Sequence, residues 1–240
     1  ADEFAKQAHP ESYASYDEAT AAKLAQAAGR TEAALDHIER ALALQPAQAR
    51  WQALAAVLEL NAGQTAKAIA HLEHAADLEP QHAAHYVALG QAQMAARYHS
   101  AAVAAFEQAH KLEKNQADTL MLLAEAHRRN RDLRQAKHFA LRAAKAAPHA
   151  VEPLMLQAEL ALQEEDGPAA KGLMENALKL TSQHPGALKI LAEALKRMGK
   201  YEQAIRILEQ TKNIAADPRP FLISSEQLIL ERRSKEMGPQ

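Results

Sequence analysis

Small and apolar residues recur along this chain at intervals of 34 residues. Two rows consist almost entirely of alanine, and a row of larger apolar residues lies between them. The first row is Ala34, Ala68, Ala102, Ala136, Ala170 and Ala204, and the second is Ala41, Ala75, Ala109, Ala143, Ala177 and Thr211. The row between them is Ile38, Leu72, Phe106, Ala140, Met174 and Leu208. Several rows with one period predict an array of helical repeats, which serves far more often as a binding surface than as an enzyme.

Each repeat is predicted to form two amphipathic helices joined by a short turn. In the sixth unit, Pro185 stands near the start of the first helix, where its missing N–H costs nothing, and Gly199 ends that helix. The apolar residues of the two helices follow helical spacing. They are Leu188, Leu191, Ala192 and Leu195 in the first helix, and Tyr201, Ala204, Ile205 and Leu208 in the second.

This pattern resembles the tetratricopeptide repeat family, whose 34-residue unit carries W-x2-L-G-x2-Y, then A-x3-F, then A and P. The third unit shows Y-x2-L-G at Tyr86–Gly90 and A-x3-F at Ala102–Phe106. The second unit shows W-x2-L-A at Trp51–Ala55, one residue out of phase with its Ala68, which predicts a one-residue insertion near Asn61–Gly63. The resemblance implies an all-α fold, a right-handed superhelical solenoid of antiparallel helix pairs.

The repeats divide the chain into three segments. Residues 1–13 are predicted to form an N-terminal leader and residues 14–218 six repeats. The six units span about 14–47, 48–81, 82–115, 116–149, 150–183 and 184–218. Residues 219–240 are predicted to form a capping helix and tail, because terminal repeats need a cover with a polar outer face. The alternative is that residues 219–236 dock on a partner or on another copy of the chain, which would give self-association.

Composition adds little about the compartment. The 240 residues include no cysteine, which excludes disulfides but fits both cytoplasmic and exported proteins. The start at Ala1 is compatible with a processed or an excised fragment. No apolar run approaches the roughly 20 residues that span a bilayer, so no membrane span is expected. The localisation is therefore predicted only as cytoplasmic or periplasmic.

Charge is distributed unevenly around a net charge of −2. Residues 114–149 hold eight basic and three acidic side chains, while the segments on either side are acidic. This alternation argues against nucleic-acid binding, which requires a basic face along the whole molecule. The basic patch of the fourth unit is Arg128, Arg129, Arg131, Arg134, Lys137 and Arg142. It is either a docking patch for an acidic protein, a phosphorylated segment or an anionic polymer, or a solvated face that balances its neighbours.

The resemblance also implies where a partner binds, since in the family the first helix of each unit lines the concave side. Three positions of this helix, spaced i, i+4 and i+7, are not used by the apolar core rows. In units three to six these groove positions hold Val87, Gln91 and Met94; Met121, Glu125 and Arg128; Met155, Glu159 and Leu162; and Lys189, Glu193 and Lys196.

The groove positions combine methionines with a row of glutamates. Thioether side chains accept varied apolar anchors, and carboxylates favour Lys or Arg on the ligand. The sequence therefore predicts a groove for an apolar and basic peptide; the alternative is ordinary packing beside a solvated acidic face. Family members that hold a C-terminal carboxylate resemble one another in having Lys with Asn or Arg at these positions. Met121 and Glu125 stand there in this chain, so that function is not expected.

Catalytic and metal chemistry find no support in the sequence. His71 and His74, and likewise His82 and His85, are spaced i, i+3, but four neutral histidines are an unusual ligand set and no carboxylate separates them. There is no cysteine nucleophile and no glycine-rich phosphate loop. We therefore expect no cofactor, no metal and no enzymatic activity.

Three functions remain open at this point. The first is a scaffold that gathers protein partners along the groove. The second is a periplasmic part of a bacterial export or envelope-assembly machine, such as one for polysaccharide secretion, that docks an enzyme or an anionic polymer; alanine- and glutamine-rich arrays resemble such exported domains. The third is self-assembly through residues 219–236.

Overall fold

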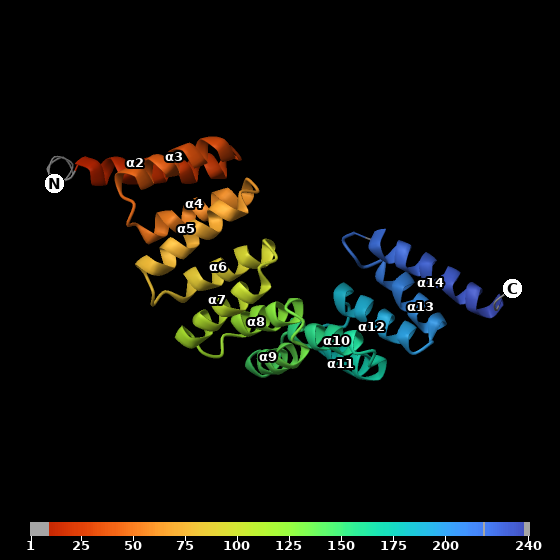
Figure 1. The fold of residues 1–240 in the computed structure, drawn as a ribbon. Helices are drawn as coiled ribbons and strands as arrows, with labels where there is room; N and C mark the ends of the chain where they lie inside the picture. Colours follow the sequence, from red (N-terminus) through yellow and green to blue (C-terminus); the bar gives the residue numbers. More distant parts are fainter. Residues whose placement is uncertain (1–9, 218, 238–240) are drawn as a thin grey trace. The chain divides into compact units, whose positions relative to one another are not determined.

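The computed structural model describes residues 10–217 and 219–237, and the regular structure of these residues is entirely α-helical. The helices follow one another in pairs (Figure 1), which confirms the predicted all-α fold of helix pairs. The pairs are α2 (Pro10–Ala27) with α3 (Thr31–Leu44), α4 (Ala49–Asn61) with α5 (Thr65–Leu78), α6 (Ala83–Ala95) with α7 (His99–Leu112), α8 (Ala117–Arg129) with α9 (Leu133–Ala146), α10 (Glu152–Gln163) with α11 (Gly167–Leu180), and α12 (Pro185–Arg197) with α13 (Tyr201–Thr211). A last helix, α14 (Arg219–Met237), packs on α13.

The chain divides into two compact units, residues 1–114 with α2–α7 and residues 115–240 with α8–α14. Each unit has apolar clusters that join consecutive helix pairs. Residues 1–9 of the predicted leader lie outside the described residues, and α2 begins at Pro10.

The two alanine rows are fully buried in the helix pairs. Every member of both rows, including Thr211, is at most 1% exposed. The larger row between them is buried as well, from Ile38 at 0% to Leu208 at 2%. Small side chains at these positions allow helix axes to approach closely, and a larger residue would overpack the contact. The prediction that these rows form the repeat core is confirmed.

One repeat shows how the rows compensate for one another. Phe106 is the largest side chain in its row, and it lies against Gly90 of α6. A Cβ atom at Gly90 would stand 2.5 Å from Phe106 Cε1. The equivalent residues of the other repeats are alanines that face smaller side chains, such as Ala56 opposite Leu72. The glycine is therefore required by the phenylalanine that faces it.

The turn within each helix pair uses a residue in the left-handed conformation. These residues recur every 34 positions: Gly29, Gly63, Arg97, Arg131, Glu165 and Gly199, with φ between 63° and 75°. Around Arg131, for example, the amide of Asp132 donates to the carbonyl of His127 at 2.9 Å. This hydrogen bond closes the helix as in a Schellman motif, for which glycine has no steric penalty. Three of the turns therefore carry a strained non-glycine residue.

The predicted one-residue insertion near Asn61–Gly63 is wrong. Helices α4, α6 and α8 begin at Ala49, Ala83 and Ala117, an unbroken spacing of 34 residues. Trp51 is therefore equivalent to His85 and not to Tyr86. Its ring is 3% exposed and packs in a cluster with residues of α2 and α3, so it contributes to the contact between pairs.

Candidate functional site

The second compact unit, residues 115–240, holds a pocket of about 380 Å³ among α10, α12, α13 and α14. Residues from the predicted groove positions line it, together with residues that the sequence did not indicate. The predicted ones are Met155, Glu159, Leu162, Lys189 and Glu193, and the others include Gly186, Ile190, Leu208, Ser224 and Leu228. The structure thus brings the groove positions of two consecutive first helices together at one cavity.

The pocket combines an apolar wall with a charged rim. Met155 extends over Gly186, where a Cβ atom would stand only 2.7 Å from Met155 Cε, so the glycine makes room for the thioether. Leu162 and Leu228 are buried, and the Glu159 side chain is 43% exposed. This arrangement can accept an apolar side chain and place a cation beside a carboxylate.

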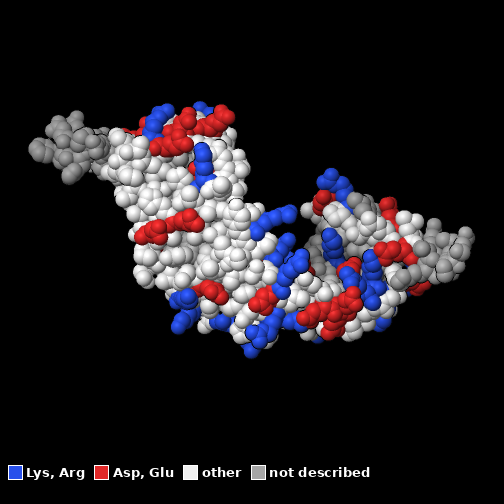
Figure 2. All heavy atoms as spheres, in the orientation of Figure 1, with Lys and Arg blue, Asp and Glu red and all other residues white. Residues whose placement is uncertain are grey.

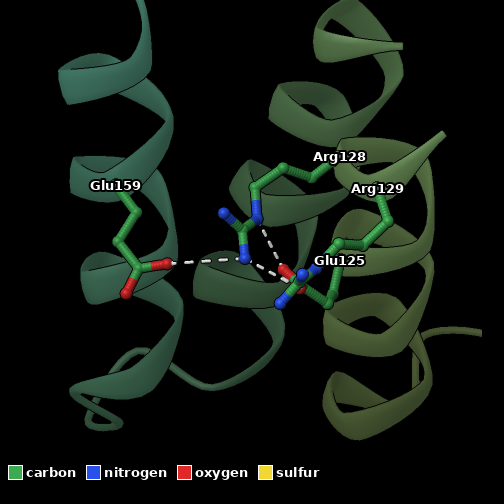
Figure 3. A network of polar contacts seen from close by, with 4 residues as sticks. All are labelled: Glu125, Arg128, Arg129 and Glu159. Carbon is green, nitrogen blue, oxygen red and sulfur yellow. Dashed lines mark hydrogen bonds and ion pairs between the residues drawn. The ribbon is translucent and has the colours of Figure 1, made fainter. Parts of the chain in front are cut away.

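Three of the charged groove positions form a network between α8 and α10 (Figure 3). Arg128 donates two hydrogen bonds to Glu125, from Nε at 2.6 Å and from Nη2 at 2.7 Å, and Arg129 donates a third at 2.7 Å. Arg128 Nη2 also lies 3.9 Å from Glu159 Oε2. Burial raises the pKa of Glu125, but the hydrogen bonds from the two arginines outweigh it and hold this pKa below its usual value.

The network changes what the glutamate row offers to a ligand. Glu125 is fully engaged by arginines of its own helix, and Glu193 accepts a hydrogen bond of 3.0 Å from Arg197. Within residues 10–217 and 219–237, the one ion-pair contact of Glu159 is that with Arg128 at 3.9 Å. Glu159 is therefore the groove carboxylate with the most capacity left for a basic side chain.

Helix α14 contributes to the site in a way that sequence reasoning missed. Its Phe221 and Leu228 are buried in the cluster that includes α12 and α13. Glu231 of the same helix accepts a hydrogen bond of 2.9 Å from Lys196, one of the predicted groove residues. The spacing of Arg219 from Pro185, again 34 residues, would have shown that α14 stands in register with the first helices.

The groove positions of the first compact unit, residues 1–114, hold apolar and uncharged polar residues. On α6, Val87 and Met94 are half-buried and Gln91 is exposed. The equivalent residues of α4 were not among the predicted groove positions. They are Ala53, Val57 and Leu60, of which Val57 is 45% exposed. The groove positions of α4 and α6 therefore carry no charge.

The predicted basic patch is largely engaged in internal contacts. Besides the two arginines of the network, Lys137 forms an ion pair with Glu164, and Arg142 Nη2 donates to Asn115 at 3.1 Å. Figure 2 shows basic side chains interspersed with acidic ones over the second unit and no continuous basic surface on the face drawn. The patch members that are exposed and have no ion-pair partner within residues 10–217 and 219–237 are Arg131 and Arg134.

The histidines considered as metal ligands have other neighbours. His82 and His85 lie with their ring centres 4.6 Å apart, and His85 Nε2 is 2.9 Å from Glu79. His71 instead contacts Gln52 and Glu59. Within the part of the chain that the structure describes, no group of three or more histidine, cysteine, aspartate or glutamate side chains could hold a metal ion. No helix of that part is apolar over a length sufficient to cross a bilayer.

Comparison with known proteins gives a family match for part of the array and a shared fold for most of it. Residues 161–221 match the sequence model of a family described as Tetratricopeptide repeat. Yeast Tom70 is similar in structure, with 17% identity, a TM-score of 0.64, and coverage of 83% of this chain and 44% of that one. PilF of Pseudomonas aeruginosa has 15% identity and a TM-score of 0.66, over 90% of this chain and 99% of PilF. YrrB, described as a TPR protein with an unusual peptide-binding site, has 16% identity and a TM-score of 0.58, over 79% and 97% of the two chains.

These similarities establish the fold. The chain spans less than half the length of Tom70, at 44%. No curated protein matches it in sequence.

Proposed function

We propose that this chain is a tetratricopeptide repeat protein and a non-enzymatic scaffold that binds a protein or peptide partner at the groove positions of its first helices. The match of residues 161–221 to the family model and the fold that the helix pairs share with known members support this proposal. The tetratricopeptide fold serves protein interaction in general. The proposal adds the location of the site and the chemistry of the ligand.

One observation carries this proposal. Five residues at the groove positions that the family resemblance and helical spacing predict line a single pocket of about 380 Å³ in the second compact unit. Pockets of a few hundred Å³ that combine apolar walls with a few polar groups are typical ligand sites. YrrB, a protein of similar structure, is described as having an unusual peptide-binding site, which supports a peptide as the class of ligand.

The chemistry of the pocket defines the ligand further. Met155, Leu162 and Leu228 favour an apolar side chain, and the methionine can adapt to several shapes. Glu159 at the rim favours a Lys or Arg next to that anchor, since the contact with Arg128 at 3.9 Å is the one ion pair of its carboxylate in the described part of the chain. The proposed ligand is therefore a peptide segment with an apolar anchor and a neighbouring basic residue.

The alternative of an anionic polymer on the fourth unit has less support. Arg128 and Arg129 pair with Glu125, Arg128 also lies 3.9 Å from Glu159, and Lys137 pairs with Glu164. A polymer would find only isolated exposed cations there.

Affinity capture from the lysate of the source organism tests the proposal. The variant Met155→Lys/Glu159→Lys places a positive charge in the apolar wall and reverses the charge at the rim. Loss of one buried apolar anchor corresponds to about 1.5–3 kcal/mol, roughly ten- to a hundredfold in affinity. We expect at least one partner to be captured by the wild type and lost with this variant.

The control is Glu209→Lys, which makes the same charge reversal as Glu159→Lys on the exposed surface of α13. Circular dichroism must show equal helicity for all three proteins. If the groove variant and the wild type capture the same partners in equal amounts, the assignment of the site is wrong.

A further inference from the structure

Gly186, in the lining of the pocket, is the single glycine among the residues that share its repeat position. At intervals of 34 positions these residues are Tyr16, Arg50, Ala84, Asp118, Glu152, Gly186 and Pro220. Gly186 is the second residue of α12, and its φ does not lie in the left-handed region, so its backbone suits any residue. The lack of a side chain therefore has its reason in the space around Gly186 and not in its conformation.

The end of Met155 occupies the space that a side chain at Gly186 would need. A Cβ atom there would stand 2.7 Å from Met155 Cε and 3.2 Å from His184 Cε1. His184 is held in place, since its Nδ1 accepts a hydrogen bond of 3.2 Å from the amide of Ala187. Met155 itself packs against the apolar cluster of α12, α13 and α14. The thioether thus rests on the bare backbone of Gly186 and forms part of the pocket wall.

The same positions of the preceding repeat are filled differently. Met121 of α8 is equivalent to Met155, and Glu152 of α10 is equivalent to Gly186. Glu152 is exposed and carries a charged side chain where Gly186 offers bare backbone. The pair of Met155 and Gly186 is therefore a feature of this pocket and not of the repeat in general.

We propose that the Met155 thioether makes this pocket selective for an aromatic side chain of a partner peptide, with Gly186 as the residue that positions the thioether. Selectivity of this kind rests on the proposed function and specifies the ligand of the same site. An apolar cavity of about 150 Å³ already holds a benzene molecule, and this pocket has about 380 Å³. A thioether about 5 Å from an aromatic ring is also attracted to it, and an aliphatic anchor gains no such contact.

The interior of the pocket suits a ring that makes no hydrogen bond. The hydroxyl of Ser224 donates to the carbonyl of Pro220 at 2.7 Å and so has a partner on its own helix. The aliphatic walls are Leu162, Ile190, Leu208 and Leu228, all at most 9% exposed. Aromatic side chains bury about 150–250 Å² each, so a ring on these walls contributes much of the affinity. Phenylalanine is therefore the expected anchor.

The spacing of residues on α10 also defines where the basic residue of the ligand stands. Met155 and Glu159 are four residues apart, so they are neighbours on one face of α10, with Cβ atoms about 5–6 Å apart. In an extended peptide, alternate side chains point to the same side and lie roughly 7 Å apart. A ring on Met155 thus brings the second residue along the peptide to Glu159. The expected ligand has Phe and Lys or Arg separated by one residue.

Methionine methyl NMR of the full chain tests this selectivity. One probe is acetyl-Lys-Ala-Phe-Ala-Lys-amide, which has a basic residue on either side of the ring. The other has cyclohexylalanine in place of phenylalanine, a ring of similar size without π electrons. The chain is labelled with ¹³C in the methyl groups of its six methionines. The signal of Met155 is assigned as the one that is lost in Met155→Leu.

We expect the phenylalanine peptide to shift the Met155 signal upfield, because the methyl group lies over the ring. This peptide should bind about two- to tenfold more tightly than the cyclohexylalanine peptide. Met155→Leu should abolish the preference but leave both peptides bound, since leucine keeps an apolar wall without the sulfur.

Gly186→Ala should also reduce the preference, because the added Cβ displaces the Met155 methyl group. It should not lower the free energy of unfolding, since that methyl group is the end of a flexible side chain and alanine favours helix. The matched control is Gly172→Ala, which makes the same change on α11, where no atom lies within 4 Å of the added Cβ. This control should bind both peptides as the wild type does.

Two results distinguish the selectivity from the proposed function. Equal affinities of the two peptides, with the Met155 signal shifted and with weaker binding to Glu159→Gln, refute the aromatic selectivity and leave the proposed site intact. No effect of either peptide on the Met155 signal refutes both.

A third result concerns the origin of the aromatic residue. Residues 1–9, which lie outside the described residues, contain Phe4 and Lys6 at the expected spacing. In the full chain without added peptide, Phe4→Ala should leave the Met155 signal unchanged. A changed signal would identify the occupant as a segment of this chain and contradict its assignment to a partner.

Discussion

Glu59 should make the stability of the first compact unit depend on pH, because it is a carboxyl group buried among helices. It is 4% exposed on α4, and its Oε1 lies 3.3 Å from Nε2 of His71 on α5. The other ring nitrogen of His71 lies 2.5 Å from Gln52 Oε1. Gln52 Nε2 donates to the carbonyl of Pro46 at 2.7 Å, which orients the amide so that its oxygen faces the histidine.

This geometry defines the protonation of the pair. An amide oxygen can only accept, so His71 carries a proton on Nδ1 and presents Nε2 to Glu59. Burial raises the pKa of Glu59 to about 7, and burial lowers the pKa of His71. Both changes favour neutral groups, and Glu59 Oε1 lies 3.3 Å from the Nε2 atom that carries no proton.

The sign of the pH dependence follows from linkage. Between pH 4.5 and about 7 the folded state keeps a proton on Glu59 that the unfolded state has lost, so the contribution of this residue to stability falls as the pH rises. Each pKa unit corresponds to 1.36 kcal/mol, so the raised pKa costs about 3 kcal/mol above pH 7 as an upper bound. Glu59→Gln removes this cost. Relative to the wild type, the variant should gain about 1–3 kcal/mol between pH 4.5 and pH 8.

Urea denaturation from pH 4.5 to 8.5, followed by the fluorescence of Trp51, measures this difference. Trp51 is the single tryptophan of the chain and lies on the same helix as Glu59, so it reports the unfolding of this region. Glu73→Gln on the exposed surface of α5 is the control and should differ from the wild type by an amount that does not depend on pH. A difference between Glu59→Gln and the wild type that stays constant over the whole range would refute the reasoning, since the carboxyl would then be ionised in the folded state at little cost.

Two further predictions concern backbone positions, and urea denaturation measures both. Gly90→Ala should lower the free energy of unfolding by about 1–3 kcal/mol, because the new Cβ meets the Phe106 ring. Adding Phe106→Leu to the same chain should recover most of this loss. An unchanged midpoint for Gly90→Ala would show that the ring can shift freely. Arg131→Gly should stabilise the chain by up to about 1 kcal/mol, because it removes the strain of a non-glycine residue in the left-handed conformation. Gly63→Ala should destabilise the chain by about 1 kcal/mol through backbone strain alone, since no atom lies within 4 Å of the added Cβ. Equal midpoints for these two variants and the wild type would contradict the assigned role of the turn.

The fold could be predicted from the sequence because helical repeats depend on contacts at fixed spacing. The alanine rows identify where helices approach closely, and the unbroken period carries this information through every pair. The predicted alignment of the second repeat was wrong by one residue. Trp51 had been matched to the motif position of Tyr86, whereas its structural equivalent is His85. In the structure Trp51 packs toward the preceding pair, where its equivalent is His85.

The candidate site was less accessible to sequence reasoning. Groove positions could be chosen from helical spacing, but the pocket depends on α14, whose position results from the packing of Phe221 and Leu228 on the last pair. The pairing of Glu125 could have been found, because Arg128 and Arg129 follow it at i+3 and i+4, the spacing of neighbours on a helix surface. The contact of Arg128 with Glu159 on α10 could not, since it depends on the arrangement of two helices.

The pairing of charges changes the specificity expected of the proposed groove. A row of three free glutamates would attract any basic segment over a long distance, and salt would weaken that attraction strongly. In the structure Glu125 and Glu193 are each engaged by arginines, so the row offers one carboxylate beside an apolar pocket. A single charge next to a shaped cavity contributes less to the rate of encounter and more to the choice of residue at one position of the ligand. On this reasoning, replacing the basic residue of a bound peptide should change its affinity only when that residue lies next to the apolar anchor.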